Sequence, residues 1–368
     1  MDDEKIYQAS LSMVPGIGDI TAKTLLSYCG SAKEVFNKSK NNHAKIPGIG
    51  QINADKCKTF NAFNQAEGEI NKCINQNITI LFILDKGYPK KLKHAPDSPM
   101  ILYYHGAANL NNHKTVAILG TQKSTRYGRE FTEIIVEQLS QHEALIVSGL
   151  AYGLDINAHK SALKHGLDTI GVMASGLDII YPSIHRGTAM EMVSQGGLLT
   201  EFKIGEKPDA HNFPLINRVI AGISDVTIVI EAAKKGGALI TAEIANSYNR
   251  DVFALPGDVN KRFSEGCNNL IKSNKTHLRT SAEDIEYIMN WEPQSNHIPS
   301  EDKYYDYSKL TNKERTVIET LKLGLDGIIL DELSWKSQIP LNKLASILLT
   351  LEFSGVVKTL PGKKYKLV

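Results

Sequence analysis

Three glycine-containing segments carry the residue types that bind oxyanions. They are residues 120–128 (GTQKSTRYG), residues 148–153 (SGLAYG) and residues 236–241 (GGALIT), and the last follows Lys234 and Lys235. Each segment leads into an expected helix, whose free N–H groups and positive dipole end can hold a phosphate oxygen. We interpret the three segments as a binding site for a phosphate-rich ligand, with ordinary tight turns as the alternative.

Four titratable side chains could do acid–base or metal chemistry. Asp155 and His159 lie four residues apart on an expected helix and could share one face. Because no third ligand or nucleophile has a recognisable spacing, a hydrogen-bonded structural pair is the favoured interpretation. Glu201 and Glu231 each end an expected strand, where they could serve an enzyme or cap loops through backbone hydrogen bonds.

Residues 212–218 (NFPLINR) place an aromatic ring five residues before an arginine, just ahead of an expected helix. A ring that stacks on a base and a cation that pairs with a phosphate are the two elements that single-strand binding uses. The alternative is that Phe213 belongs to the core and Arg218 to a surface ion pair.

Several enzyme signatures are absent from the sequence. It contains no GxxxxGK[ST], HExxH or GxSxG motif and no GxGxxG after the first strand of the middle segment, which argues against a motor ATPase or an ordinary dehydrogenase. The four cysteines form no CxxC pair, so buried free thiols are favoured over a metal site. We therefore expect neither a metal nor a cofactor.

The composition is that of a globular protein of two or three domains, with 368 residues, 42% hydrophobic and 22% charged. Its net charge of +2 means that any basic surface must be local. No apolar run approaches the ~20 residues of a membrane span, and the start, MDDEKIYQAS, is polar. A cytoplasmic protein without a membrane segment is expected.

The middle of the chain alternates short apolar runs with helical patterns. The expected strands VAILG, ALIVSG, TIGVMA, LLTEF, VTIVIEA and VFALPG begin at residues 116, 144, 169, 198, 226 and 252. Continuous apolar runs of this kind are typical of parallel strands covered on both faces. An α/β fold with a doubly wound sheet follows, and its ligands bind where the carboxyl ends of the strands meet.

The two ends of the chain have different patterns. VPGIG at residues 14–18 recurs as IPGIG at residues 46–50, the helix-hairpin-helix signature, which could hold phosphates or serve only as a packing module. Residues 292–308 are expected to be a linker. Residues 309–368 predict three helices and a hairpin, a winged helix suited equally to protein or DNA contact.

Eight motifs from Val116 to about Trp291 together resemble the DNA-processing protein A (DprA/Smf) family. In order they are GTQKSTRYG, IVSGLAYGLDINAHKSAL, GLDIIYP, NFPLINRVIAG, VTIVIEA, GGALITA, NRDVFALPG and GCNNLI. The resemblance implies an extended Rossmann-type domain at residues 86–291, between a helix-hairpin-helix (SAM-like) domain at 1–85 and the winged helix. It also implies a cytoplasmic, non-enzymatic protein of natural transformation that binds single-stranded DNA, protects it on entry and helps to load RecA recombinase.

The resemblance also implies site residues, all in the segments described above. Leu270 and Ile271 are candidates for a homodimer interface. Gln122, Lys123, Arg126 and Lys235 are included as loop neighbours of the matched positions. The predicted DNA-binding set is Gly120, Thr121, Gln122, Lys123, Thr125, Arg126, Ser148, Gly149, Gly153, Phe213, Asn217, Arg218, Lys235 and Gly237.

Two positions depart from the family pattern. Gln122 and Ile216 stand where the family usually has arginine. The loss of two phosphate contacts would weaken the salt dependence of binding. Cations that could compensate are Lys123, Arg126, Lys203, Lys234 and Lys235.

Two other functions remain open. Residues 235–243 distantly resemble the PGGxGTxxE motif of nucleotide phosphoribohydrolases, but Ile240 occupies the place of the third glycine, where a phosphate must approach closely. A scaffolding protein whose loops no longer bind is the third interpretation.

Overall fold

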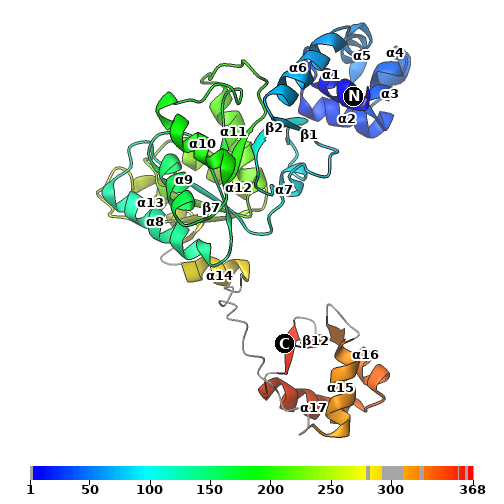
Figure 1. Cartoon of the computed structure of the whole chain (residues 1–368), viewed down its shortest axis with the longest axis vertical. Coiled ribbons are helices and arrows are strands. Elements are labelled where there is room, and N and C mark those ends of the chain that lie inside the picture. Colours follow the sequence, from blue (N-terminus) through cyan, green and yellow to red (C-terminus); the bar gives the residue numbers. More distant parts are fainter. Residues whose placement is uncertain are drawn as a thin grey trace. The chain divides into compact units, whose positions relative to one another are not determined.

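The computed structural model describes residues 3–278, 282–291, 310–322, 327–354, 356–360 and 364–367. The chain divides into two compact units, Met1–Gln294 and Ser295–Val368 (Figure 1). The expected linker at residues 292–308 lies outside the described residues.

A nine-stranded sheet forms the centre of the first unit. Its strand order is β1-β2-β6-β5-β4-β3-β7-β8-β9. The run from β6 to β9 is parallel, whereas β2 is antiparallel to both β6 and β1. The strands are β1 (Thr79–Phe82), β2 (Ile101–Gly106), β3 (Thr115–Gly120), β4 (Leu145–Gly149), β5 (Thr169–Val172), β6 (Gly196–Thr200), β7 (Val226–Glu231), β8 (Asp251–Ala254) and β9 (His277–Leu278).

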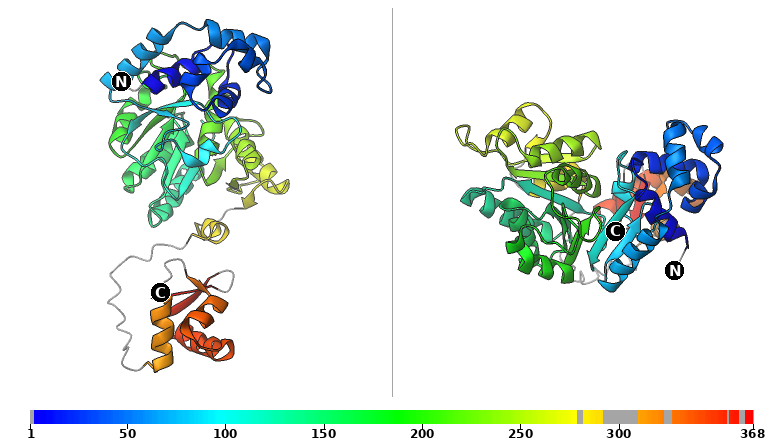
Figure 2. Two further views of the ribbon diagram at one scale, coloured as in Figure 1. Left: turned by 90° about the vertical axis from the view of Figure 1, so that its right-hand side faces the viewer. Right: turned by 90° about the horizontal axis from the view of Figure 1, so that it is seen from above.

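Helices cover both faces of the sheet, as the apolar strands predict (Figures 1 and 2). Val116 and Ile118 of β3 pack with α8 (Arg126–Ser140) and α9 (Leu154–Lys164). The alternate residues Ala117 and Leu119 belong to a second cluster with α11 (Asn212–Ile223). Because side chains alternate along a strand, both faces of β3 are buried and the predicted doubly wound sheet is confirmed.

Besides the N-terminal helices described below, this unit has further short helical elements, most of them in segments without a clear sequence pattern. β1 precedes residue 85, so the sheet starts before the predicted domain boundary. The short helical elements are α7 (Lys90–Lys93), the 3-10 helix η1 (Ser183–His185), α10 (Arg186–Ser194), α12 (Gly237–Ser247), α13 (Glu265–Lys272) and α14 (Ala282–Met289).

The N-terminal region is helical, as predicted. Each apolar-Pro-Gly repeat forms the turn between two helices, with Gly16 at φ +76° and Gly48 at φ +79°, conformations that favour glycine. Four aromatic rings, those of Tyr7, Phe36, Phe60 and Phe63, fill its interior. The helices are α1 (Asp3–Ser12), α2 (Asp19–Cys29), α3 (Ala32–Asn37), α4 (Lys40–Ala44), α5 (Gly50–Thr59) and α6 (Phe63–Asn75).

The second unit has the predicted winged-helix elements. A short strand that the sequence did not indicate, β10 (Ile328–Ile329), adds to the hairpin. The other elements are α15 (Asn312–Lys322), α16 (Leu330–Ser337), α17 (Leu341–Phe353), β11 (Val357–Leu360) and β12 (Lys364–Leu367).

Candidate nucleic-acid interface

The first two glycine-containing loops meet at the carboxyl edge of the sheet. Gly153 has φ +84°, and a Cβ there would lie 2.3 Å from the carbonyl oxygen of Thr121 and 2.5 Å from that of Gln122. Only glycine fits such a close approach. The structure therefore brings residues 120–122 and 148–153 together, as parallel strands with a common carboxyl edge require.

The Asp155 carboxyl group lies against loop amides that were predicted from the sequence to hold a phosphate. Burial raises the pKa of this carboxyl group to about 7, and the backbone N–H groups of Ala151 and Gly120 oppose that rise. The neighbouring Ser148 hydroxyl donates to the Ile118 carbonyl at 2.6 Å. A Cβ at Gly149 would lie 2.7 Å from Asp155 Oδ2. An internal carboxyl group thus occupies much of the anion-binding capacity of the second loop.

His159 has a structural role at the same place. It is fully buried, its Nε2 lies 2.8 Å from the Gly149 carbonyl oxygen, and its Nδ1 lies 2.7 Å from Thr169 Oγ1. Burial lowers the pKa of the imidazole to about 4. Both groups are structural, as favoured, but the expected hydrogen bond between Asp155 and His159 is wrong. His159 bonds to Gly149 and Thr169, and Asp155 to the backbone of Gly120 and Ala151.

Glu231 fixes the first loop from the end of β7. Its Oε2 accepts from the Thr125 N–H at 3.0 Å and its Oε1 from the Thr125 hydroxyl at 2.5 Å. The same hydroxyl accepts from the Gly128 N–H at 3.2 Å and caps α8. Of the two roles considered for Glu231, the structure shows loop capping. Gln122, Lys123 and Arg126 remain exposed around this fixed loop.

The third loop is the most open of the three. Gly236 precedes α12 without a side-chain cap, and no atom lies within 4 Å of a Cβ built on Gly236 or Gly237. Both glycines are exposed, as are Lys234 and Lys235. Unlike the amides facing Asp155, this helix N-terminus is presented to solvent beside two cations.

Residues 212–218 lie within α11, so the expectation that they precede a helix is wrong. Pro214 is tolerated because N–H groups of the first helical turn have no partner inside the helix. Phe213 is half-buried, with its ring 6.4 Å from that of Tyr181. Asn217 is also half-buried, whereas Ile216 is buried in the core. Phe213 and Tyr181 supply a partly exposed aromatic surface.

Arg218 lies away from these loops, in an ion network with the N-terminal region. Its guanidinium pairs with Glu201, lies 3.3 Å from Asp19 Oδ2 and donates to the Asp97 carbonyl. The Arg218 side chain is only 10% exposed. Despite this cation, burial raises the pKa of Glu201 to about 7. Glu201 is therefore an ion-pair partner, and the geometry does not support a direct phosphate contact for Arg218.

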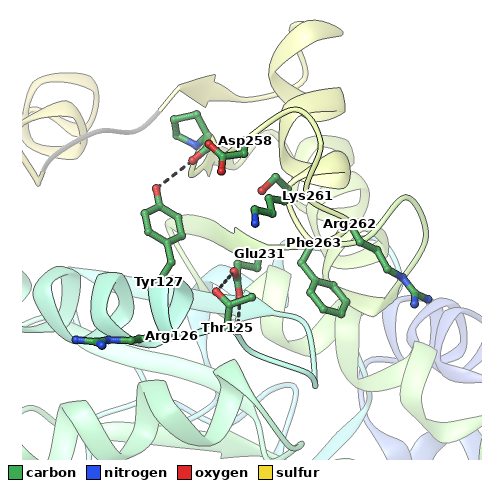
Figure 3. Close-up of a pocket in the computed structure, with 11 residues that line it drawn as sticks. Thr125, Arg126, Tyr127, Glu231, Asp258, Lys261, Arg262 and Phe263 are labelled. Carbon is green, nitrogen blue, oxygen red and sulfur yellow. Dashed lines mark hydrogen bonds between the residues drawn. The ribbon is translucent and has the colours of Figure 1, made fainter.

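A pocket of about 640 Å³ opens beside the first loop (Figure 3). Its floor holds Thr125 and Glu231, and its far wall is residues 256–264, which follow β8. The sequence prediction missed this wall, although its position after a parallel strand and its cations Lys261 and Arg262 were the available signal.

The candidates for a dimer interface lie on α13, and the carboxylate of the enzyme-like motif lies on α12. Leu270 is 5% exposed and belongs to the core beneath α13, while Ile271 is half-buried beside it. Glu243, the carboxylate of the enzyme-like motif, forms a half-exposed ion pair with Lys275 at 2.7 Å.

Cys57, Cys73 and Cys267 are buried free thiols, and burial raises the pKa of Cys57 to about 11, whereas Cys29 is half-buried. Across the described ranges, no cluster of candidate metal ligands occurs and no helix is long and apolar enough to cross a bilayer.

Comparison with known proteins identifies the family. The model of DNA recombination-mediator protein A matches residues 79–290, and the DprA winged helix domain matches residues 306–363. Protein Smf of Synechocystis is 30% identical over 99% of both chains. DNA processing protein DprA of Streptococcus pneumoniae is 38% identical over 55% of this chain and 71% of its own.

Two solved structures share the fold. The crystal structure of DprA from Streptococcus pneumoniae matches 78% of this chain and 98% of its own, with a TM-score of 0.66 and 30% identity. A solved structure of DNA processing protein A from Helicobacter pylori, described for its single-stranded DNA binding mode, matches 58% of this chain and 95% of its own, with a TM-score of 0.53 and 29% identity. Because the family model matches more than half of this chain and Protein Smf of Synechocystis aligns with 99% of it, this chain belongs to the DprA/Smf family of DNA recombination-mediator proteins.

Proposed function

We propose that this protein binds single-stranded DNA at the carboxyl edge of its sheet and does not cleave it. The observation that carries the proposal is the exposed N-terminus of α12, with Gly236 and Gly237 beside Lys234 and Lys235. Backbone N–H groups and lysines contact phosphates without reading the bases, so binding is independent of sequence. The single-stranded DNA binding mode of the Helicobacter pylori relative supports this choice of ligand.

We rank the predicted DNA-binding residues by their exposure and by the internal contacts that they already make. Lys235 and Gly237 are the foremost phosphate contacts, with Gln122, Lys123 and Arg126 on the neighbouring loop. Gly120, Thr121, Thr125, Ser148, Gly149 and Gly153 shape the edge of the sheet through their internal contacts, and Phe213 and Asn217 offer a base-stacking and hydrogen-bonding surface.

Family membership supports a wider role. We propose that the protein acts in the cytoplasm during natural transformation, where it protects incoming single strands and helps to load RecA recombinase. We also propose a homodimer formed near α13. Because Leu270 is committed to the core, Ile271 is the better interface candidate. Ile271→Glu should therefore shift the mass measured by light scattering toward the monomer.

The test of DNA binding is a Gly237→Leu variant, titrated with oligo-dT by fluorescence anisotropy. A Cβ at this exposed position meets no protein atom within 4 Å, so we expect the fold to tolerate leucine, while the added side chain blocks the approach of a phosphate to the helix N-terminus. We expect binding at least tenfold weaker than wild type, with single strands preferred over duplex by the wild-type protein.

The matched control is Gly68→Leu on α6, where a Cβ also meets no atom within 4 Å. It should bind as wild type does. Equal affinity of the Gly237→Leu and Gly68→Leu variants for oligo-dT would contradict the assignment of α12.

A further inference from the structure

The pocket beside the first loop has the shape and lining of a site for a single nucleotide. Figure 3 shows the rings of Tyr127 and Phe263 on opposite sides of it, with Lys261 directed into the space between them. Glu231 and Thr125 form the floor. At about 640 Å³ the pocket has a volume typical of small-molecule sites.

The two rings are held in place with a free face toward the pocket. The Tyr127 hydroxyl donates to the Pro256 carbonyl at 3.1 Å, and the ring packs against Phe131 at a centroid distance of 5.2 Å. Tyr127 nevertheless remains 45% exposed. Phe263 is half-buried, and its backbone carbonyl accepts from the Ala232 N–H at 2.7 Å, which fixes it to the end of β7.

The far wall is a built structure. The Asn268 side chain exchanges two hydrogen bonds with the backbone of Gly257, at 2.8 and 3.2 Å. A Cβ at Gly257 would lie 2.3 Å from Ser264 Oγ, so the turn closes on itself too tightly for another residue. The pocket therefore exists before a ligand enters, which lowers the cost of ordering on binding.

Two carboxylates line the pocket, Glu231 and Asp258, and Glu231 is already bonded to Thr125. Of the three cations in the lining, only Lys261 points inward. Arg126 is bound to Glu130 at 2.6 Å, and Arg262 lies over the Phe263 ring at 5.8 Å; both extend away from the space in Figure 3. Lys261 is left to meet a phosphate, while the ring faces meet a base. Stacking of this kind tolerates any base.

We propose that this pocket binds one nucleotide of the DNA strand, with its base against Tyr127 and Phe263 and its phosphate on Lys261. The pocket adjoins the 120–126 loop, so a strand that leaves the α12 contacts can continue into it. The inference rests on the proposed single-stranded DNA binding and adds residues 256–264 to it.

The experiment compares Tyr127→Ala, Phe263→Ala and Lys261→Gln with wild type on oligo-dT of increasing length. We expect Tyr127→Ala and Phe263→Ala to bind the longer oligonucleotides at least about fivefold more weakly, the loss that one base-stacking contact produces. Lys261→Gln should bind more weakly and lower the slope of log K against log salt by about 0.7, as the loss of one phosphate contact does. Tyr127→Phe, which keeps the ring, should bind more tightly than Tyr127→Ala. The matched control is Lys160→Gln, an exposed lysine on α9, which should bind as wild type does.

Photo-cross-linking with 5-iodouracil oligonucleotides gives a second readout that does not depend on variants. A cross-link mapped by mass spectrometry to Tyr127 or Phe263 is expected. If wild type binds oligo-dT, all three variants bind equally well and no cross-link reaches the pocket, the inference is overturned and the proposed function stands. If wild type binds no oligonucleotide of any length, both are overturned.

Discussion

The position of Arg218 shows how buried partners decide the role of a side chain. By type and spacing Arg218 resembles a phosphate contact, yet its guanidinium joins α11 to Glu201 and to Asp19 of the N-terminal region. Removing one member of a buried ion pair leaves the other charge without compensation, which typically costs about 3 to 5 kcal/mol. Arg218→Ala should therefore lower the free energy of unfolding by about 3 kcal/mol, as measured by urea denaturation.

A double variant separates this structural role from DNA binding. Arg218→Met combined with Glu201→Met removes both charges, so it should be more stable than Arg218→Ala alone. If Arg218→Ala unfolds at the same urea concentration as wild type but binds oligo-dT more weakly, Arg218 is a DNA contact after all.

The two positions that lack the family's arginine, Gln122 and Ile216, lie in different environments. Gln122 is exposed on the first loop, so Gln122→Arg can add one phosphate contact and should steepen the slope of log K against log salt by about 0.7 for single strands. Ile216 is 6% exposed, and Ile216→Arg would bury a charge without a partner. A salt titration of both variants checks this: an unchanged slope for Gln122→Arg would mean that the loop does not contact phosphate.

At the scale of elements, His159 ties α9 to β4 and β5 and makes their stability depend on pH. Because burial lowers the pKa of its imidazole to about 4, below the ordinary value of 6.5, the unfolded chain binds the proton more readily. Stability from this group is complete above pH 6.5 and is lost as the pH falls toward 4.

The His159→Gln variant isolates this contribution. The difference in unfolding free energy between wild type and variant should grow by about 1.4 kcal/mol per pH unit between pH 4 and 6.5 and stay constant above that range. Asp155, whose pKa is raised to about 7, changes stability in the opposite direction but is present in both proteins. A difference that does not vary with pH would show that the pKa of His159 is the same in the folded and unfolded states.

The elements were largely predictable from the sequence, and their side-chain partners were not. The six apolar runs all became parallel strands because continuous burial on both faces leaves a local pattern. β9, with two residues at an edge of the sheet, left no pattern, whereas β1 lies within the apolar run at residues 78–84, which was not assigned to a strand. The partners of Gly120, Glu231 and Arg218 lie up to 199 residues away in the chain, and no local pattern reports such a distance.

For the whole molecule, the net charge of +2 is consistent with a binding edge built from a few local groups. The winged-helix unit adds no comparable surface on its third helix. Leu341, Leu349 and Phe353 of α17 are 45, 54 and 84% exposed, and such apolar side chains make poor contacts to phosphates. We infer that DNA affinity resides in the first unit, residues 1–294, and that the winged helix contributes little to it.

A chain that ends at residue 294 should therefore bind oligo-dT within about twofold of the full-length affinity. The slope of log K against log salt should change by less than the value of about 0.7 that one phosphate contact contributes. Anisotropy titrations of the two chains at several salt concentrations measure both quantities. The control is Gly237→Leu in the shortened chain, which should lose binding to the same extent as in the full chain. If the shortened chain binds tenfold more weakly while circular dichroism shows the same melting transition for its sheet, the winged helix contacts DNA despite its apolar face.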